Sequence, residues 1–521
     1  MKPPCEPLPL IFGAAGSSWS FYGQDDYRVT RNLTLNLGMR WELNTFMAGI
    51  RGQTNAFDFA TGKVIIPTIN GQPDFTAQPG DRIATNWAVF RSYLETTEEL
   101  GLPWSIRPRD NLCPAPRIGF AWRAFGSDKW VVRSAYGIFY VYPDTNLLQP
   151  LYRTPPFNVI QIVNNDVPTA STLTPTRNLA NYFLGQPLAS LNTTPAISTA
   201  LSFYRTTYVQ TWNFNLQHQF SNSMAAEVAY VANKGTRMQY ASAGNVPQPG
   251  PGNVQARRPY PQWGVFLLQQ WGGSSSYHSL QAKVEKRFSK GISFLGAYTL
   301  SKCLDWPGSE EGAAPATYLD NQNKGPCSFD VTHNFVTSYV WELPFGKGRK
   351  FLSHAPRAVD AVLGGWQWQG INTLQSGVPY TVTINTDRAN TGQSGQRPDS
   401  IAPTVEPRTL SCWYFTSANP GCKALLPNQA DTFILPAQFT YGNLGRNTLR
   451  GDRLVQLDMS LIKRWQFTES KGFEFRAQVF NLTNTPSFSN PGGTSNLNTG
   501  GQVTSTRNQP RLFEFGAKFA F

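Results

Sequence analysis

Apolar and polar residues alternate along the end of the chain, over residues 511–521. Every odd-numbered position from Phe513 to Phe521 is apolar, and four of these five positions are Phe. The positions between them include Glu514 and Lys518. Because successive side chains of a strand point to opposite faces, this pattern predicts a strand with one apolar face and one wetter face.

The same alternation recurs along most of the chain. Between residues 32 and 44, for example, Leu33, Leu35 and Leu37 alternate with polar residues. Such segments come in pairs joined by short polar turns, and long loops separate most pairs. The predicted strands cover residues 18–29, 32–44, 115–125, 129–142, 206–220, 224–234, 276–288, 291–304, 328–343, 365–384, 453–467, 472–482 and 511–521.

This rhythm predicts an all-β protein, an antiparallel transmembrane β-barrel with short periplasmic turns and long extracellular loops. There are about thirteen strands, each long enough to cross a bilayer, which takes about 9 to 11 residues. No run of about 18 apolar residues occurs, which argues against a membrane-spanning helix. Placing Arg at Leu37 is therefore expected to cost far more than a change at Asn36, on the other face.

The number of strands carries a second expectation. With alternating directions, the first and the thirteenth strand both run down to the periplasm, whereas single-chain bacterial barrels have even strand numbers. We therefore expect further strands upstream, and we expect residues 1–17 to be the irregular start of a fragment and residues 18–521 to be the C-terminal part of a barrel. Residues 1–7 also lack the apolar core of an export signal.

The net charge of +13 comes from 45 basic and 32 acidic residues, and charged residues make up only 15% of the chain. A basic chain can attract anionic partners such as nucleic acid or lipopolysaccharide. Since no block of basic residues occurs, we favour cations that line a polar lumen and its rim, and we expect no nucleic-acid partner.

No sequence pattern predicts an enzyme. GxSxG, HExxH and GxxxxGK[ST] are all absent from the sequence, and the four histidines are scattered. Asp25 and Asp26 are adjacent, so a strand would point them to opposite faces, which suits a structural role better than acid–base work. We expect no catalytic residue, no cofactor and no metal site.

Four of the six cysteines lie within predicted loops or beside them. Cys303 and Cys327 flank one loop, and Cys412 and Cys422 lie close together in another. Both pairs are candidate disulfides in an oxidising compartment. Cys5 and Cys113 are left unassigned.

Several charged residues fall on the predicted lumen face, and we expect them to pair across strands within the wall rather than to relay a substrate. Aromatic residues near strand ends are expected to form interfacial girdles. The charged set is Arg40, Glu42, Lys283, Glu285, Arg287, Glu474, Arg476, Glu514 and Lys518, and the aromatic set is Tyr298, Tyr339, Trp341, Trp366 and Trp368.

Seven segments in order resemble one known family. They are residues 21–42, 116–120 (PRIGF), 136–140 (YGIFY), 279–288 (SLQAKVEKRF), 298–302 (YTLSK), 342–349 (ELPFGKGR) and 480–484 (FNLTN). Together they resemble TonB-dependent outer-membrane receptors, and within these the Oar-like subgroup. The resemblance extends from about residue 18 to the end of the chain.

The resemblance implies a barrel of about 22 strands with a plugged lumen, of which this chain supplies the last thirteen or so. It implies the cell outer membrane as the location, lipid and lipopolysaccharide as surroundings, and import of a large ligand. Phe519 and Phe521 are then the expected signal for the barrel-assembly machinery. The TonB complex is expected to act through an N-terminal plug that this sequence lacks.

Two other functions remain open at this stage. The chain is alternatively an outer-membrane adhesin or surface-binding protein whose loops contact cells or polymers without active transport. A secreted soluble β enzyme is the third alternative, and no catalytic pattern supports it. The sequence does not identify the ligand.

Overall fold

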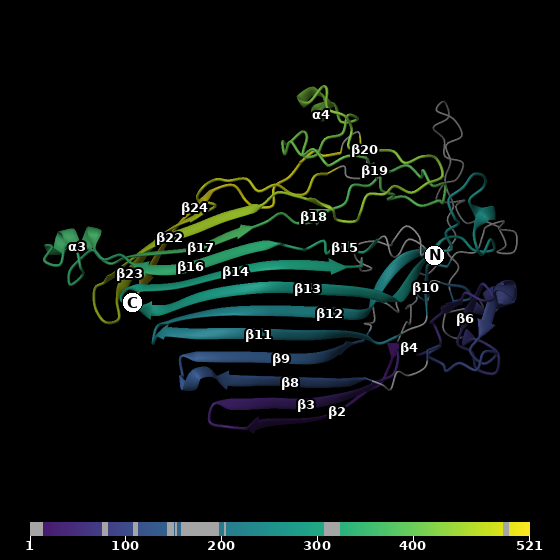
Figure 1. The fold of residues 1–521 in the computed structure, drawn as a ribbon, viewed down its shortest axis with the longest axis horizontal. Coiled ribbons are helices and arrows are strands. Elements are labelled where there is room, and N and C mark those ends of the chain that lie inside the picture. Colours follow the sequence, from purple (N-terminus) through teal and green to yellow (C-terminus); the bar gives the residue numbers. More distant parts are fainter. Residues whose placement is uncertain are drawn as a thin grey trace, which may run out of the picture.

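The computed structural model describes residues 14–75, 82–107, 113–142, 151, 154–157, 197–202, 205–306, 323–492, 497 and 500–521. These residues build one large antiparallel sheet whose strands lie side by side along their lengths (Figure 1). Short turns join the strands at one end, the turn end, and long loops gather at the other, the loop end (Figure 1). Cys5 and most of residues 1–17 lie outside the described part of the chain.

Two of the 15 strands of this sheet, β10 and β15, lie off the hydrogen-bonded path, and the other thirteen follow one another in chain order. Each is antiparallel to the next. The path runs through β2 (Ser18–Arg28), β3 (Leu33–Asn44), β8 (Pro114–Arg123), β9 (Trp130–Val141), β11 (Thr207–Ser221), β12 (Met224–Gly244), β13 (Phe266–Ser289), β14 (Ile292–Asp305), β16 (His333–Glu342), β17 (Trp366–Gln375), β22 (Leu454–Gln466), β23 (Gly472–Phe480) and β24 (Leu512–Ala520).

The strand register keeps one apolar face across the whole path. Residues directly opposite each other in antiparallel strands share a face. Leu37 lies opposite Ile118, Phe214 lies opposite Tyr230, and Val479 lies opposite Phe513. The polar residues between them form the other face, so the all-β, antiparallel prediction is confirmed.

Large apolar side chains on this face remain open to the surroundings. Phe515 is 73% exposed, Phe513 is 57% exposed and Phe214 is 51% exposed. In contrast, the largest fully buried side chains lie mostly in the loops and include Trp263, Tyr414, Phe415 and Phe433. A sheet that keeps its aromatic face uncovered while its loops bury theirs is built for contact with lipid on that face.

Each predicted strand overlaps one strand of the path, but several ends differ. β12 and β13 continue well past the predicted residues 234 and 276, and their pairing persists as far as Gly244 and Phe266. The extension packs Phe266 and Leu268 into the core of a loop region. β16 and β17 are shorter than predicted, because the chain leaves the sheet after the backbone contact of Ser376 with His333.

The first group of loops forms a small folded unit at the loop end. It contains a three-stranded sheet of β5 (Ala56–Asp58), β6 (Lys63–Ile66) and β7 (Leu94–Thr96). Its other elements are helix α1 (Arg82–Phe90), the 3₁₀ turns Arg91–Tyr93 and Gln255–Arg257, β10 (Thr199–Leu201), which runs parallel to β13, and the pair β1 (Ala14–Ala15) and β4 (Ala48–Gly49). β1 pairs residues 14 and 15 with β4 through the backbone.

A second group of loops forms another folded unit. It holds β18 (Pro379–Tyr380) paired with β21 (Leu449–Arg450), β19 (Asp399–Ser400) paired with β20 (Phe433–Ile434), and α4 (Pro420–Leu425). β15 (Gly325–Pro326) pairs with the end of β14. At the turn end, a 3₁₀ turn (Ala124–Gly126) joins β8 to β9, and α3 (Arg357–Leu363) lies beyond the strand ends (Figure 1).

β2 and β24 are the two edges of the sheet, and they do not pair with each other within the described residues. Twelve successive reversals of direction leave these two edge strands running the same way, so direct closure would require a parallel pair. None of the described helices is both long and apolar enough to cross a membrane.

Candidate functional site

Charged side chains on the polar face of the sheet form ion pairs near the turn end. Glu474 on β23 accepts from Arg464 Nε on β22 at 2.6 Å and from Arg476 Nη2 at 3.0 Å. Lys518 on β24 lies directly opposite Glu474 in register. One carboxylate therefore serves two guanidinium groups, and this part of the wall keeps a net positive charge.

A second group lies near the middle of the sheet. Lys283 on β13 lies 3.8 Å from Glu227 on β12 and 3.8 Å from Glu285 on its own strand. Arg40 pairs with Glu42 at 2.6 Å within one strand. This last pair corrects the expectation of cross-strand pairing, because the residues opposite Arg40 are Tyr22 and Ala115, which carry no charge.

Not every residue of the predicted charged set has an ion-pair partner. Among the described residues, Glu514 and Lys518 form no ion pair. They lie on the edge strand β24, where only one neighbouring strand is present. The charged set thus contains ion-paired groups on the inner strands and solvated charges on the edge. Arg287 fits neither group, because it lies on the inner strand β13 and also forms no ion pair among the described residues.

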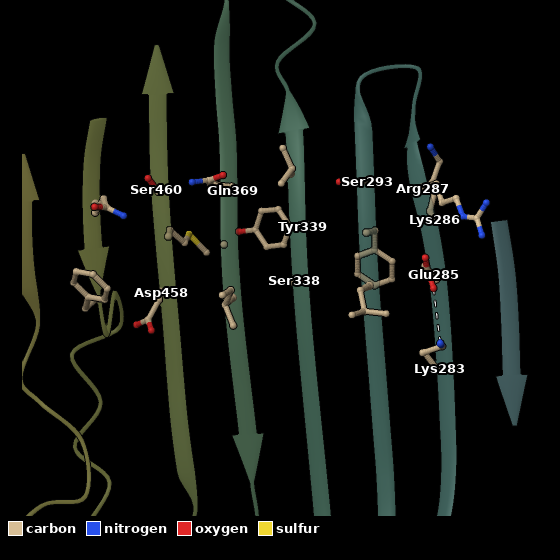
Figure 2. Close-up of a pocket in the computed structure, with 18 residues that line it drawn as sticks. Lys283, Glu285, Lys286, Arg287, Ser293, Ser338, Tyr339, Gln369, Asp458 and Ser460 are labelled. Carbon is tan, nitrogen blue, oxygen red and sulfur yellow. Dashed lines mark ion pairs between the residues drawn. The ribbon is translucent and has the colours of Figure 1, made fainter. Parts of the chain in front are cut away.

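A groove of about 700 Å³ lies on the sheet between β13 and β23 (Figure 2). Most of its lining residues share the polar face. They are Lys283, Glu285, Lys286, Arg287, Ser293, Phe294, Leu295, Ser338, Tyr339, Val340, Gln369, Gly370, Ile371, Asp458, Met459, Ser460, Gln478 and Phe480. Its volume lies in the range of sites that hold small ligands.

The polar-face side of this groove also carries apolar side chains. By register, Leu295, Ser338 and Ile371 share a face with Asp458 and Gln478. Ile371 is 58% exposed there. A polar wall with an exposed apolar patch suits an amphipathic ligand or another protein segment.

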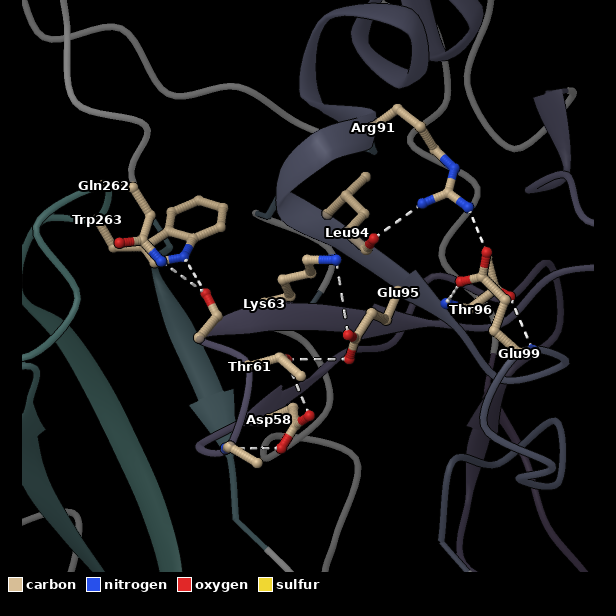
Figure 3. Close-up of polar contacts among 12 residues, drawn as sticks. Asp58, Thr61, Lys63, Arg91, Leu94, Glu95, Thr96, Glu99, Gln262 and Trp263 are labelled. Atoms are coloured by element: carbon tan, nitrogen blue, oxygen red, sulfur yellow. Dashed lines mark hydrogen bonds and ion pairs between the residues drawn. The ribbon is translucent and has the colours of Figure 1, made fainter.

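The first loop unit, which we name the first loop head (residues 46–75, 82–107 and 245–268), has its own apolar core. Phe57, Val64, Leu94, Trp263 and Phe266 are all buried in it. Trp263 Nε1 donates to the Gly62 carbonyl at 2.8 Å (Figure 3). The contact joins loops that are far apart in sequence, so this head is a packed structure.

Polar contacts on the first loop head surround this core (Figure 3). Glu95 lies 3.7 Å from Lys63 Nζ and accepts from the Thr61 hydroxyl at 3.1 Å. The Thr96 N–H and the Arg91 guanidinium hold the pKa of Glu99 below its usual range. These contacts keep the charged surface of the head ordered.

Arg107 at the base of the first loop head is buried with little compensation. It is 4% exposed, and its Nε and Nη1 have no hydrogen-bond partner within the described part of the chain. Nη2 donates to the Ser202 carbonyl at 3.1 Å, and the guanidinium lies 5.0 Å from the centre of the Phe46 ring. Burial lowers the pKa of Arg107 to about 9.

The second loop unit, which we name the second loop head (residues 378–450), is tied to the sheet by two arginines. Arg446 donates to the Asp305 carboxylate, to the Asp305 carbonyl at 2.9 Å and to the Asn323 carbonyl at 2.8 Å. Arg450 pairs with the buried Asp330. Sequence reasoning missed both contacts, and the polar stretch 441–450 was their only signal.

Two disulfides lie at the loop end, one between the end of β14 and the loop that follows it, and one within the second loop head. Cys303 is bonded to Cys327, with Cα atoms 5.4 Å apart, and Cys412 is bonded to Cys422, with Cα atoms 4.9 Å apart. They are the two pairs that the sequence suggested. Cys113 is buried at the loop end of the sheet.

The aromatic set lies on the apolar face, as the register shows for Trp341 opposite Trp368. Their ring centres are 6.0 Å apart, and Tyr339 packs against Trp368 at 5.5 Å. Tyr298 contacts His333 at 2.8 Å between its hydroxyl and Nδ1. Asp25 lies opposite Leu37 on the apolar face, whereas Asp26 accepts from Asn36 on the other face at 2.6 Å.

Comparison with known families gives one extensive match. A family model described as "Outer membrane beta barrel domain" matches residues 12–514. No curated protein matches the chain.

Solved structures that match cover nearly the whole chain at low identity. The outer membrane transporter YddB from Escherichia coli is 10% identical, with 97% of this chain and 45% of that chain covered and a TM-score of 0.46. The ferripyoverdine receptor of Pseudomonas aeruginosa is 10% identical, with 98% and 39% covered and a TM-score of 0.41. The ferric-catecholate import receptor Fiu from E. coli K12 is 10% identical, with 98% and 45% covered and a TM-score of 0.39. The chain thus spans less than half the length of these proteins.

Proposed function

We propose that this chain, which belongs to the outer membrane beta-barrel domain family, forms the wall and surface loops of a receptor that imports a large ligand across the cell outer membrane. The proposed type is a TonB-dependent receptor of the Oar-like subgroup. The seven ordered sequence segments that resemble this subgroup support the assignment.

One structural observation carries the proposal. Two folded loop heads lie at the loop end of a sheet whose polar face holds ion pairs and a groove of about 700 Å³. Loops with their own cores present a preformed surface to a ligand, and a polar wall suits the passage of a solvated one. Together these features fit a ligand that is captured by the loop heads and then moves along the polar face of the sheet.

The proposal includes two partners. TonB would supply the energy through a plug domain, which none of the described residues forms. The barrel-assembly machinery would recognise the end of β24, where Phe519 and Phe521 stack at 6.4 Å and Phe521 is 92% exposed. Lipid and lipopolysaccharide would surround the apolar face.

Adhesion without transport is the second candidate. It is favoured by the separate apolar cores of the two loop heads, because such heads can bind a cell or polymer without any channel. Loss of the ion pairs and groove residues on the polar face would then have no effect on function.

The test compares cells of the producing bacterium with and without the gene. Untargeted mass spectrometry of the medium identifies any solute that only gene-carrying cells remove, and an uncoupler of the proton-motive force shows whether removal needs energy. Import predicts energy-dependent removal that is impaired by Ile371→Lys in the groove. Attachment of cells that depends on the gene, resists the uncoupler and accompanies no solute removal would favour adhesion instead.

A further inference from the structure

The turn between β16 and β17, residues 343–365, differs from the other turns at its end of the sheet. β11 and β12 are joined by residues 222–223, and β13 and β14 by residues 290–291. The longer turn instead contains α3, which lies beyond the ends of the strands (Figure 1). Reversal of the chain direction alone does not explain why the turn of residues 343–365 is so long.

Three side chains from the apolar face hold the end of α3 in place. Trp366 Nε1 donates to the Val362 carbonyl at 2.8 Å, and Trp465 Nε1 donates to the Ala361 carbonyl at 2.8 Å. Lys463 Nζ donates to the Gly364 carbonyl and, at 3.2 Å, to Val362. The last carbonyls of a helix attract a cation, so Lys463 both satisfies and fixes this end.

An apolar groove of about 410 Å³ lies between this turn and the sheet. Its lining residues are all apolar: Leu343, Phe345, Leu352, Leu363, Trp366 and Leu461. A second groove, of about 390 Å³, shares Leu343 and Leu461 and continues over the apolar face toward β24. The two grooves form a track open to the lipid phase.

Basic residues lie on the turn beside this track. Lys347, Lys350 and Arg357 are exposed, and no ion pair engages them within the described chain. Lys350 Nζ lies 5.4 Å from the Phe351 ring, which packs at 5.6 Å against Phe345 in the groove lining. The cationic head of Lys350 is therefore close to an apolar site, as in residues that extend toward a membrane surface.

The acidic residues of this region do not cancel that charge. Glu342 is engaged by Arg349 at 2.8 Å. Asp360 accepts from the backbone N–H of Lys347 at 2.6 Å. Val362 and Leu363 are 64% and 49% exposed on α3, so the turn presents apolar and cationic groups together.

We propose that the turn binds an anionic phospholipid of the periplasmic leaflet. An acyl chain lies in the track over Leu343 and Leu461, and the phosphate lies against Lys347, Lys350 and Arg357. An apolar groove that opens to lipid, with cations at its end, matches a molecule that is apolar at one end and anionic at the other. The assignment rests on the outer-membrane location and the expected direction of the turns, and it is independent of ligand import.

The test uses the full chain, purified in detergent and examined by native mass spectrometry with added lipid. Wild-type protein is expected to bind phosphatidylglycerol at least about tenfold more tightly than phosphatidylcholine. The triple variant K347Q/K350Q/R357Q is expected to lose this preference. The matched control R31Q/K129Q/K471Q removes three exposed cations from other turns and is expected to keep it.

A second pair of measurements tests the acyl part. Leu461→Trp fills the track while keeping the cations, so it is expected to weaken phosphatidylglycerol binding. Heat-dependent gel mobility shows whether the Leu461→Trp variant folds. If it does not fold, Leu363→Ser, which lies outside the sheet, is used in its place. Glycerol 3-phosphate, which carries the anion without acyl chains, is expected not to compete.

Four outcomes would overturn the proposal. If wild-type protein binds the two phospholipids equally well, charge has no role in binding. If the control triple variant loses the preference as fully as K347Q/K350Q/R357Q does, the cations of this turn have no special role. Full competition by glycerol 3-phosphate would show a simple anion site. Binding of lipid A as tight as that of phosphatidylglycerol would remove the assignment to one leaflet.

Discussion

Buried and half-buried cations in this protein differ in how fully their surroundings satisfy them. Lys463 is only 2% exposed, yet it donates to carbonyl groups at the end of α3. Arg107 is 4% exposed, and two of its nitrogens have no partner among the described residues. A buried charge without compensation costs free energy, so Arg107 is a weak point of the first loop head.

Arg107→Met is expected to stabilise the first loop head by about 1 kcal/mol, because it removes a poorly satisfied charge and keeps an apolar stem against Phe46. The measurement is the rate of protease cleavage within residues 46–107 of the protein in lipid vesicles. A gain of this size makes cleavage about fivefold slower. Arg107→Lys, which keeps the charge, serves as the control and is expected to give no gain.

The pH dependence of this region follows from the same residue. The folded-state pKa of about 9 lies below the ordinary value of 12.5, so the unfolded state binds more protons between these values. The cost is fully present below pH 9, and stability is expected to rise with pH above it. A cleavage rate that shows the same pH dependence in Arg107→Met would contradict this origin.

Substitutions on the two faces should differ in cost. Phe214→Arg places a charge on the lipid side of a central strand and is expected to cost about 2 to 4 kcal/mol, whereas Asn213→Arg on the polar face is expected to cost little. Denaturant unfolding in lipid vesicles measures both. Equal costs would mean that the assignment of faces is wrong.

The structure also changes the choice of site for this test. From sequence alone, Leu37 and Asn36 would serve as test sites for the two faces just as well as Phe214 and Asn213. The register places Asp25 directly opposite Leu37, so an Arg at that position gains a carboxylate partner. Phe214 lies opposite Ser134 and Tyr230 and offers no such compensation.

At the scale of elements, the loops are organised as much as the strands. The second loop head is held to the sheet by Arg446, which is 8% exposed and reaches Asp305 on β14. Contacts of this kind join residues that are far apart in sequence, such as Arg450 and Asp330. These contacts attach the second loop head to the sheet.

Arg446→Ala is expected to cost about 3 to 5 kcal/mol in the local stability of the second loop head, because it leaves Asp305 and several carbonyl groups without this cation. Hydrogen exchange of residues 378–450 measures the effect. Arg408→Ala is the control, since Arg408 is exposed and its pair with the half-buried Glu406 is expected to contribute about 1 kcal/mol or less. Unchanged exchange in the Arg446 variant would show that the head is held by its apolar core alone.

At the scale of the whole molecule, the sheet has two distinct ends and two distinct faces. The loop heads and both disulfides lie at one end, and α3 and the short turns lie at the other (Figure 1). This asymmetry predicts one orientation in the outer membrane, with the heads outside the cell.

Inserted epitope tags test that orientation. Gly252 at the loop end and Gly126 at the turn end both have positive φ and open space around them, so each should accept an insertion. Antibody is expected to label intact cells only for the tag after Gly252, and permeabilised cells for both. If antibody labels intact cells that carry the tag after Gly126, the orientation is the opposite of the one predicted. The basis of the phospholipid assignment is then removed.

Alternation at period two was enough to predict the strands, their faces and the membrane-facing side, because these are local consequences of how side chains project from an extended chain. The cysteine pairs were visible for a similar reason, since Cys303 and Cys327 flank one loop and Cys412 and Cys422 lie within another. The extension of β12 and β13 was not visible, because Phe266 and Leu268 gain their burial from a loop core assembled from distant segments.

Tertiary structure alone decided the groove, the loop heads and the phospholipid track. The groove depends on register between β13 and β23, which places Ile371 beside Asp458. The track exists because Lys463 and two tryptophans hold α3 against a strand that lies far along the chain. Such contacts depend on the relative positions of whole elements, whereas the alternation along one strand depends only on its own residues.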